Sequence, residues 1–224
     1  MSSVFTCLLL SLRQLGEPAV LRVLLKSLGV SLLLFAALAL AGWWGLDALL
    51  ERAGLAEDLR GLASLVLTLL GLWLCWRLIA MLVIQFYAED VVRAVEARHY
   101  PQAASAARDL PWNEALRVSL SNAGRALLFN LIALPFALLL LVTGIGPALL
   151  FWLLNAVLIG RELADMVWLR HAHAHPGLSP VSKWERLALG GVIAALFAVP
   201  FAALLAPVLG AAAAAHLVHR KTAA

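Results

Sequence analysis

Three histidines alternate with alanines in the segment "HAHAH", and imidazole is a common ligand of transition metals. These histidines are His171, His173 and His175. Alternating imidazoles on an extended chain can chelate copper or nickel. A catalytic zinc site would also need a carboxylate or a fourth ligand at helical or strand spacing, and the sequence has no HExxH motif. Since Pro176 and Gly177 follow at once, we expect a solvated cytoplasmic linker, with no resident metal and no cofactor. Metal sensing through these three histidines stays open as the alternative.

A cluster of charged residues precedes the histidines, at the end of a long apolar run. Its members are Arg161, Glu162 and Asp165. On a helix, Arg161 and Asp165 are four residues apart and can pair, which is worth roughly 0.2–0.5 kcal/mol at an exposed site. Because an unpaired charge near lipid costs more, we expect this pairing. Two interpretations stay open: a helix that leaves the membrane with neutralised charges, or an ion-pair lock or ion site against a neighbouring helix.

An arginine beside a helix start is the third candidate for chemistry. In "SLRQLGEP", residues 11–18, Arg13 precedes a proline that can open a helix. Backbone N–H groups at a helix start, together with a guanidinium, favour a tetrahedral oxyanion. The alternative is that Arg13 anchors a phosphate headgroup of the lipid, and both interpretations stay open.

The composition predicts an integral membrane protein. Of the 224 residues, 63% are apolar and only 13% are charged, against roughly 25% charged residues in a soluble domain. The net charge is +4. The lysines and arginines are scattered between apolar runs and form no patch with aromatic residues, so we expect no nucleic-acid partner. The sequence has no GxSxG, P-loop or GxGxxG motif, and we expect no enzymatic activity.

The apolar runs predict an all-α membrane protein with a single domain over residues 1–224. An amphipathic pattern at 3–15 predicts a helix that lies in the membrane interface. The segment 19–46 contains an uncharged stretch of about the 20 residues that a full span needs. A second transmembrane helix is expected at 61–98, extending into the cytoplasm, and we expect Arg77 within it to snorkel to the interface.

Two further apolar blocks are expected to fold back as helical hairpins, at 114–171 and 184–219. The first has no charge over 126–160, and as one helix this stretch would be about 50 Å long against a hydrocarbon core of about 30 Å. The glycines and proline of "TGIGP", 143–147, supply its turn, and two prolines interrupt the second block. The arms suit re-entrant or short spanning helices. Since broken helices at membrane depth are tolerated where they are buried in protein or line a cavity, the hairpins indicate a transport path.

The distribution of positive charge predicts the topology. Lysines and arginines cluster at 13–26, 93–125, 161–186 and 220–221, which all fall on one side of the membrane if the chain crosses twice and then folds back twice from that side. Only Arg52 and Arg60 lie in the loop between the first two spans, where four carboxylates offset them. The positive-inside rule therefore predicts cytoplasmic N- and C-termini.

Three segments together resemble a known family. The segment "PALLFWLLNAVLIGRELADMVWLRH" combines an asparagine, a short apolar stretch and Gly-Arg-Glu, and the segments "VPFAALLAPVLGAAAAAHLVHR" and "EDVVRAVEARHYP" lie on either side of it. In this order they are similar to the EI24 domain family, which contains the bacterial CysZ sulfate permeases. The resemblance covers nearly the whole chain. It implies a bacterial inner-membrane protein with two long transmembrane helices and two half-penetrating hairpins, assembled in the lipid bilayer as a homo-oligomer.

The resemblance also implies an anion site and an activity. CysZ proteins place a Gly-Leu-Arg element ahead of the first long helix to bind sulfate for cysteine synthesis. The matching residues here are Ser11, Leu12 and Arg13, and Glu17 stands where the family has a later basic residue. We therefore expect a transporter or channel for sulfate or a related small anion.

In a protein of this kind, the charged cluster Arg161, Glu162 and Asp165 would hold the first hairpin against a neighbouring helix. The alternative function is a structural or regulatory membrane protein that has the EI24 fold and transports nothing.

Overall fold

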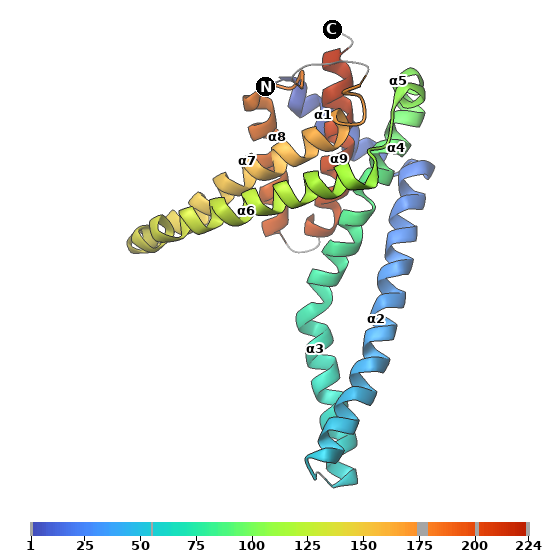
Figure 1. Ribbon diagram of the computed structural model, residues 1–224, viewed down its shortest axis with the longest axis vertical. Helices are drawn as coiled ribbons and strands as arrows, with labels where there is room; N and C mark the ends of the chain where they lie inside the picture. The colour runs from blue at the N-terminus through green and yellow to red at the C-terminus, as the bar shows by residue number, and fades with distance from the viewer. Residues whose placement is uncertain (1, 55, 174–178, 200–201, 223–224) are drawn as a thin grey trace. The chain divides into compact units, whose positions relative to one another are not determined.

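The computed structural model describes residues 2–54, 56–173, 179–199 and 202–222, and the side chains of 2–3, 58, 73–86 and 204 lie outside the description. Its described residues form helices and no strands, which confirms the all-α prediction (Figure 1). The helices are α1 (Ser2–Gln14), α2 (Pro18–Arg52), α3 (Glu57–Phe86), α4 (Ala88–His99), α5 (Pro101–Ala106), α6 (Trp112–Leu140), the 3-10 helix η1 (Leu141–Thr143), α7 (Gly146–Trp168), α8 (Lys183–Ala198) and α9 (Ala202–Thr222).

The chain divides into two compact units. The first consists of residues 1–21 and 88–224, and the second of residues 22–87.

The second unit is a hairpin of α2 and α3. Its turn contains Gly54 with a positive φ of 79°, a backbone conformation that glycine adopts without steric cost. Beside the turn, the Arg60 Nε atom lies 3.0 Å from Asp47 Oδ1, and Arg60 Nη1 lies 3.4 Å from Glu51 Oε1. These pairs neutralise the arginine at the end of the hairpin. The side chain of Arg77, expected to snorkel, lies outside the described residues.

The segment expected as one helix over 61–98 forms two helices. Helix α3 ends at Phe86 and α4 begins at Ala88, so the interruption lies at Tyr87. Helix α4 has its own polarity, with Glu89 and Asp90 in the first turn and basic residues in the last turn. Carboxylates at a helix N-terminus and cations at its C-terminus interact favourably with the helix dipole, and this arrangement favours a separate helix here.

Helices α6 and α7 form an antiparallel hairpin in the first unit, side by side in Figure 1. The predicted turn lies between η1 and α7. Gly144 has a φ of 74°, and the Gly146 N–H donates to Thr143 Oγ1 at 2.8 Å. Both helices are longer than the arms expected from the uncharged stretch, because the polar segments on either side of it are helical too.

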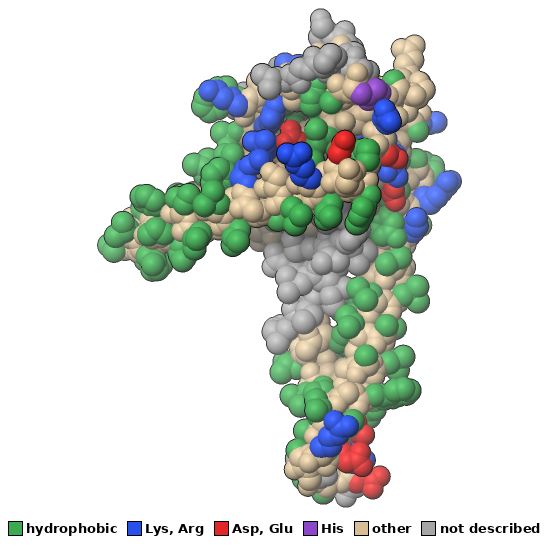
Figure 2. Space-filling model, viewed as in Figure 1, with side chains coloured by type: hydrophobic (Ala, Val, Ile, Leu, Met, Phe, Trp, Pro, Cys, Tyr) green, Lys and Arg blue, Asp and Glu red, His purple; other side chains and the backbone are tan. Residues whose placement is uncertain are grey.

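Among the described residues, three helices are long and apolar enough to cross a membrane, by length and composition: α2, α6 with η1, and α7. Hydrophobic side chains cover the outer surface of the α6–α7 hairpin (Figure 2). Leu131, Leu139 and Leu149 are all more than half exposed there. Such a surface needs lipid or another protein to cover it.

Helix α9 is the core of the first unit and packs against α1, α4, α7 and α8. Ala211–Ala215 are all buried, and alanine lets neighbouring helices approach closely. Pro207 lies inside α9 and does not end it, whereas Pro200 lies outside the described residues. Helix α8 begins with a capping box: the Ser182 hydroxyl accepts from the Glu185 N–H, and the Glu185 carboxylate accepts from the Ser182 N–H.

Small residues allow α7 and α8 to touch along their backbones. A Cβ atom added to Gly160 would collide with the carbonyl of Arg186, and one added to Gly190 would collide with the carbonyl of Ala156. The Trp152 indole N–H donates to the Gly191 carbonyl at 3.0 Å across the same interface. These contacts hold α7 and α8 together at close range.

Candidate functional site

The most buried charged side chain among the described residues is Glu96, with no solvent exposure. It lies on α4 beside Val92 and Val95, which are also buried. A carboxylate at this position on an apolar helix face needs partners, because burial of an unpaired charge is very costly. Residues from two other elements supply them.

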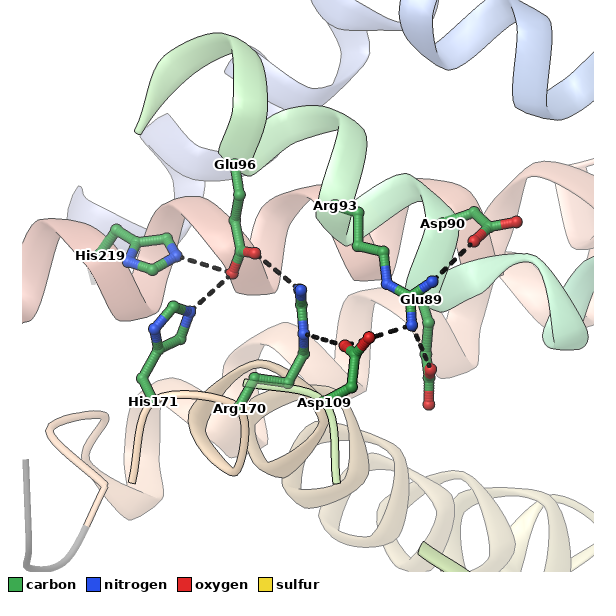
Figure 3. A network of polar contacts seen from close by, with 8 residues as sticks. All are labelled: Glu89, Asp90, Arg93, Glu96, Asp109, Arg170, His171 and His219. Carbon is green, nitrogen blue, oxygen red and sulfur yellow. Dashed lines mark hydrogen bonds and ion pairs between the residues drawn. The ribbon is translucent and has the colours of Figure 1, made fainter. Parts of the chain in front are cut away.

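The partners of Glu96 come from the turn after α7 and from α9 (Figure 3). Arg170 Nη1 donates to Glu96 Oε2 at 2.6 Å. The Nε2 atoms of His171 and His219 lie 2.9 Å and 3.0 Å from the other oxygen, Oε1. Each carboxylate oxygen therefore has its own set of donors, and Glu96 links three segments that are far apart in the sequence.

This environment keeps Glu96 ionised. Burial by itself raises the pKa of the Glu96 carboxyl, but hydrogen bonds from His171 and His219 and the charge of Arg170 outweigh burial and lower this pKa from 4.5 to about 2. At neutral pH the cluster thus holds a carboxylate and a guanidinium, with two imidazoles directed at one carboxylate oxygen.

An ion-pair chain extends from this cluster to the protein surface. Arg170 Nε lies 3.4 Å from Asp109 Oδ1, a distance that suits an ion pair, although the atoms are not aligned for a hydrogen bond. The same Asp109 oxygen lies 3.3 Å from Arg93 Nη2, and Arg93 also pairs with Glu89 and Asp90. The charges alternate in sign along this chain, as Figure 3 shows.

A second polar chain joins α1, α4 and α9. The His216 Nε2–H donates to Gln14 Oε1 at 2.9 Å, so its Nδ1 accepts from the Tyr100 hydroxyl at 2.8 Å. His99 Nε2 lies 3.0 Å from Gln14 Nε2 and 3.2 Å from Glu17 Oε2. The Glu17 carboxylate is therefore directed at His99.

A cavity of about 550 Å³ lies between the two polar chains. Its lining includes His99, Tyr100, His171, His219 and Thr222. The Tyr100 ring stacks at 4.7 Å from the His219 ring, centroid to centroid. Three imidazoles therefore border one open space in the first unit.

The candidate anion ligands Ser11, Leu12 and Arg13 lie in the last turns of α1. Ser11 is buried, and its hydroxyl donates to the Cys7 carbonyl at 2.8 Å. Leu12 and Arg13 are exposed, and the Arg13 guanidinium has no hydrogen bond or ion pair within the part of the chain described here. Helix α2 begins at Pro18, which has no N–H, so its free N–H groups begin at Ala19, beyond the turn. Ser11, Leu12 and Arg13 therefore lie at a helix C-terminus. An anion site at these three residues stays a prediction.

The charged cluster at the end of α7 contains the predicted ion pair. Arg161 Nε donates to Asp165 Oδ2 at 3.2 Å. Asp165 also lies 4.0 Å from Arg186 of α8. Arg161 and Glu162 face α6, where they line a cavity of about 240 Å³ together with Ser119, Asn122 and Arg125. The cluster thus contacts both helices that flank α7.

The expectation of a solvated linker is wrong for His171. The chain turns after α7, where the His171 N–H donates to the Trp168 carbonyl, and this turn places the imidazole inside the cluster with 5% exposure. His173 is exposed, and His175 lies outside the described residues. Alternation in sequence gave no means of deciding which histidine faces the core.

Sequence reasoning did not identify Glu96, Arg170 or His219. One signal was present for Glu96, because it stands on the same helix face as Val92 and Val95, where a carboxylate is unexpected. Nothing comparable marked His219, since a lone histidine near the end of an apolar helix has many possible roles.

Comparison with known proteins gives the family. A family model described as sulfate transporter CysZ/etoposide-induced protein 2.4 matches residues 7–207. No curated protein and no solved structure matches the chain. The matched residues include α4, α7, α8 and the segment of α1 that carries Ser11, Leu12 and Arg13. The chain belongs to the EI24 family, the family of the sulfate transporter CysZ and etoposide-induced protein 2.4.

Proposed function

We propose that this protein is a transporter or channel for sulfate or a related small anion in the bacterial inner membrane. The observation that carries the proposal is the match of the sulfate transporter family model over residues 7–207. The three helices that are long and apolar enough to span a membrane agree with it. The termini would be cytoplasmic, and no enzymatic step or cofactor is required.

Arg13 is the first candidate contact for the anion. Its side chain is exposed on α1, and a guanidinium binds oxyanions through charge-assisted hydrogen bonds. The nearby Glu17 would repel an anion, but its carboxylate is directed at His99 at 3.2 Å. The side chains of Ser11 and Leu12 would contribute little to anion binding. The Ser11 hydroxyl donates its hydrogen bond to the Cys7 carbonyl, and Leu12 is apolar.

The cavity between α6 and α7 is the second candidate contact. Arg125 and Arg161 line it together with a serine, an asparagine and the Glu162 carboxylate. The arginines, the serine and the asparagine can donate hydrogen bonds to an oxyanion, whereas Glu162 opposes its binding when ionised. It lies in the hairpin whose outer surface is apolar (Figure 2). Polar groups in such a hairpin mark a path for solute when they line a cavity.

A homo-oligomer in the lipid bilayer is part of the proposal. The exposed leucine side chains of α6 and α7 would contact lipid or a second copy of the chain. Cross-linking of the purified protein in lipid nanodiscs tests this part, and a strictly monomeric protein would contradict it.

Uptake of radiolabelled sulfate into proteoliposomes tests the function. Wild-type protein is expected to give sulfate flux above protein-free liposomes, and Arg13→Ala and Arg125→Ala are expected to reduce it at least about tenfold, the loss of one charge-assisted hydrogen bond. Arg117→Ala is the matched control, because Arg117 is exposed on α6 and is absent from the cavity lining.

A second candidate function is a structural or regulatory membrane protein without transport. The hydrogen bond between Ser11 and the Cys7 carbonyl favours it, because that hydroxyl donor is not available to an anion. Selective sulfate flux through the purified protein would exclude this alternative. Absence of flux from well-folded protein in liposomes would support it.

A further inference from the structure

We propose that Glu96, His171 and His219 form a binding site for a divalent transition-metal ion, with Zn²⁺ as the best fit. Two imidazoles and one carboxylate are donors that zinc accepts in proteins. The proposal does not depend on anion transport, because none of these residues lies in the candidate anion contacts. It differs from a metal site in the tract of alternating histidines, of which only His171 takes part.

The donor atoms are already gathered. One donor atom from each residue lies within 4.8 Å of the others. The two histidine Nε2 atoms lie 2.9 Å and 3.0 Å from Glu96 Oε1. Two ligand atoms that each lie about 2.1 Å from a zinc ion are roughly 3.0–3.4 Å apart at octahedral to tetrahedral angles. An ion can therefore replace the two N–H donors at Oε1 with small movements of the side chains.

The two oxygens of Glu96 would have different partners: Oε1 would bind the metal ion, and Oε2 would stay hydrogen-bonded to the protein. Arg170 holds Oε2 at 2.6 Å and leaves Oε1 to the histidines. A hydrogen bond to the free oxygen of a metal-bound carboxylate orients that ligand, as outer-sphere partners commonly do. Asp109, at 3.4 Å from Arg170 Nε, offsets the positive charge that would otherwise oppose a cation. Metal binding requires each imidazole to carry its proton on Nδ1 so that the Nε2 lone pair faces the ion.

The adjoining cavity supplies access and room for the remaining ligands. His171 and His219 both line this cavity of about 550 Å³. Water can therefore complete the coordination of an ion held by three protein ligands, as in zinc sites with an open position. Because the ligands come from α4, the turn after α7 and α9, a bound ion would also brace these three elements.

Titration calorimetry of the full-length protein in detergent, with Zn²⁺ as the only added metal, tests the proposal. We expect one ion per chain with a dissociation constant in the micromolar range or below. Even outer-sphere residues change metal affinity by about 10–100-fold, so Glu96→Gln and His219→Ala should each weaken binding by at least about 100-fold. His173→Ala is the matched control, because His173 belongs to the same tract but is exposed, and it should keep wild-type affinity.

X-ray absorption spectroscopy of the zinc-loaded wild-type protein provides a test that needs no variant. We expect two imidazole ligands and otherwise oxygen ligands. Absence of zinc binding by folded wild-type protein would overturn the proposal. A spectrum with sulfur or with three or more imidazoles would also overturn it, as would loss of binding in His173→Ala with retention in Glu96→Gln.

Discussion

Arg170 Nη1 lies 2.6 Å from Glu96 Oε2, and Glu96 has no exposure to solvent. The pair joins the turn after α7 to α4 inside the first unit. A buried carboxylate that loses its cation cannot recover the lost interaction from water. The Glu96–Arg170 pair is therefore a structural link between these two segments, and removal of either residue leaves the charge of the other without its main partner.

Removal of the cation alone should destabilise the protein strongly. Arg170→Met is expected to lower the free energy of unfolding by about 3 kcal/mol, because it leaves the Glu96 carboxylate buried with only the histidines as partners. Chemical unfolding in detergent, with a chelator present, measures the change. The double variant Glu96→Leu with Arg170→Met should lose less free energy of unfolding, relative to wild type, than Arg170→Met alone, because it leaves no unpaired carboxylate. A greater loss in the double variant would show that the unpaired charge is not the cause.

The acid sensitivity of the fold should depend on Glu96. Its pKa is about 2 in the folded protein, below the ordinary value of 4.5, so the folded state favours the ionised form. The stabilisation is present above pH 4.5 and is lost as the pH falls from 4.5 to 2. The difference in unfolding free energy between wild type and Glu96→Gln, measured with a chelator, should shrink over this range. A difference that stays constant from pH 5 to pH 2.5 would contradict the lowered pKa.

The contact between α7 and α8 should tolerate no side chain at Gly160. A Cβ atom there collides with the Arg186 carbonyl, and backbone cannot move aside as a flexible side chain can. Gly160→Ala is expected to cost at least about 2 kcal/mol, at the upper end of the range for overpacking. Gly124→Ala on α6 is the control, because nothing lies within 4 Å of its Cβ position. Equal stability of the two variants in thermal unfolding would argue against the close approach.

The N-terminus of α8 should depend on the Ser182 hydroxyl. Ser182→Ala removes the side-chain acceptor of the Glu185 N–H and should lower the free energy of unfolding by about 1 kcal/mol. Ser182→Gly should cost only a few tenths of a kcal/mol, since glycine is a tolerated N-cap residue. Chemical unfolding of both variants measures the difference, and an unchanged free energy of unfolding in Ser182→Ala would indicate that the cap contributes little.

Particular residues show how far sequence reasoning reached. The turn at 143–147 followed from its glycines, and Gly144 does take the positive φ that the turn needs. The Arg161–Asp165 pair followed from helical spacing and is present at 3.2 Å. The interruption of 61–98 at Tyr87 did not follow, because the apolar pattern of α3 runs directly into the amphipathic pattern of α4 with no glycine or proline between them.

The sequence by itself determined the class of the protein. Its apolar runs, sparse charges and ordered family segments require an all-α membrane protein of the EI24 family. These are local properties, since hydropathy and helix periodicity act over a few turns of chain. The tertiary structure alone decided that Glu96, His171 and His219 meet, although 75 and 123 residues separate Glu96 from the two histidines. Only the packing of α9 against α4 and the turn after α7 brings these side chains within hydrogen-bonding distance, and no spacing along the chain encodes that encounter.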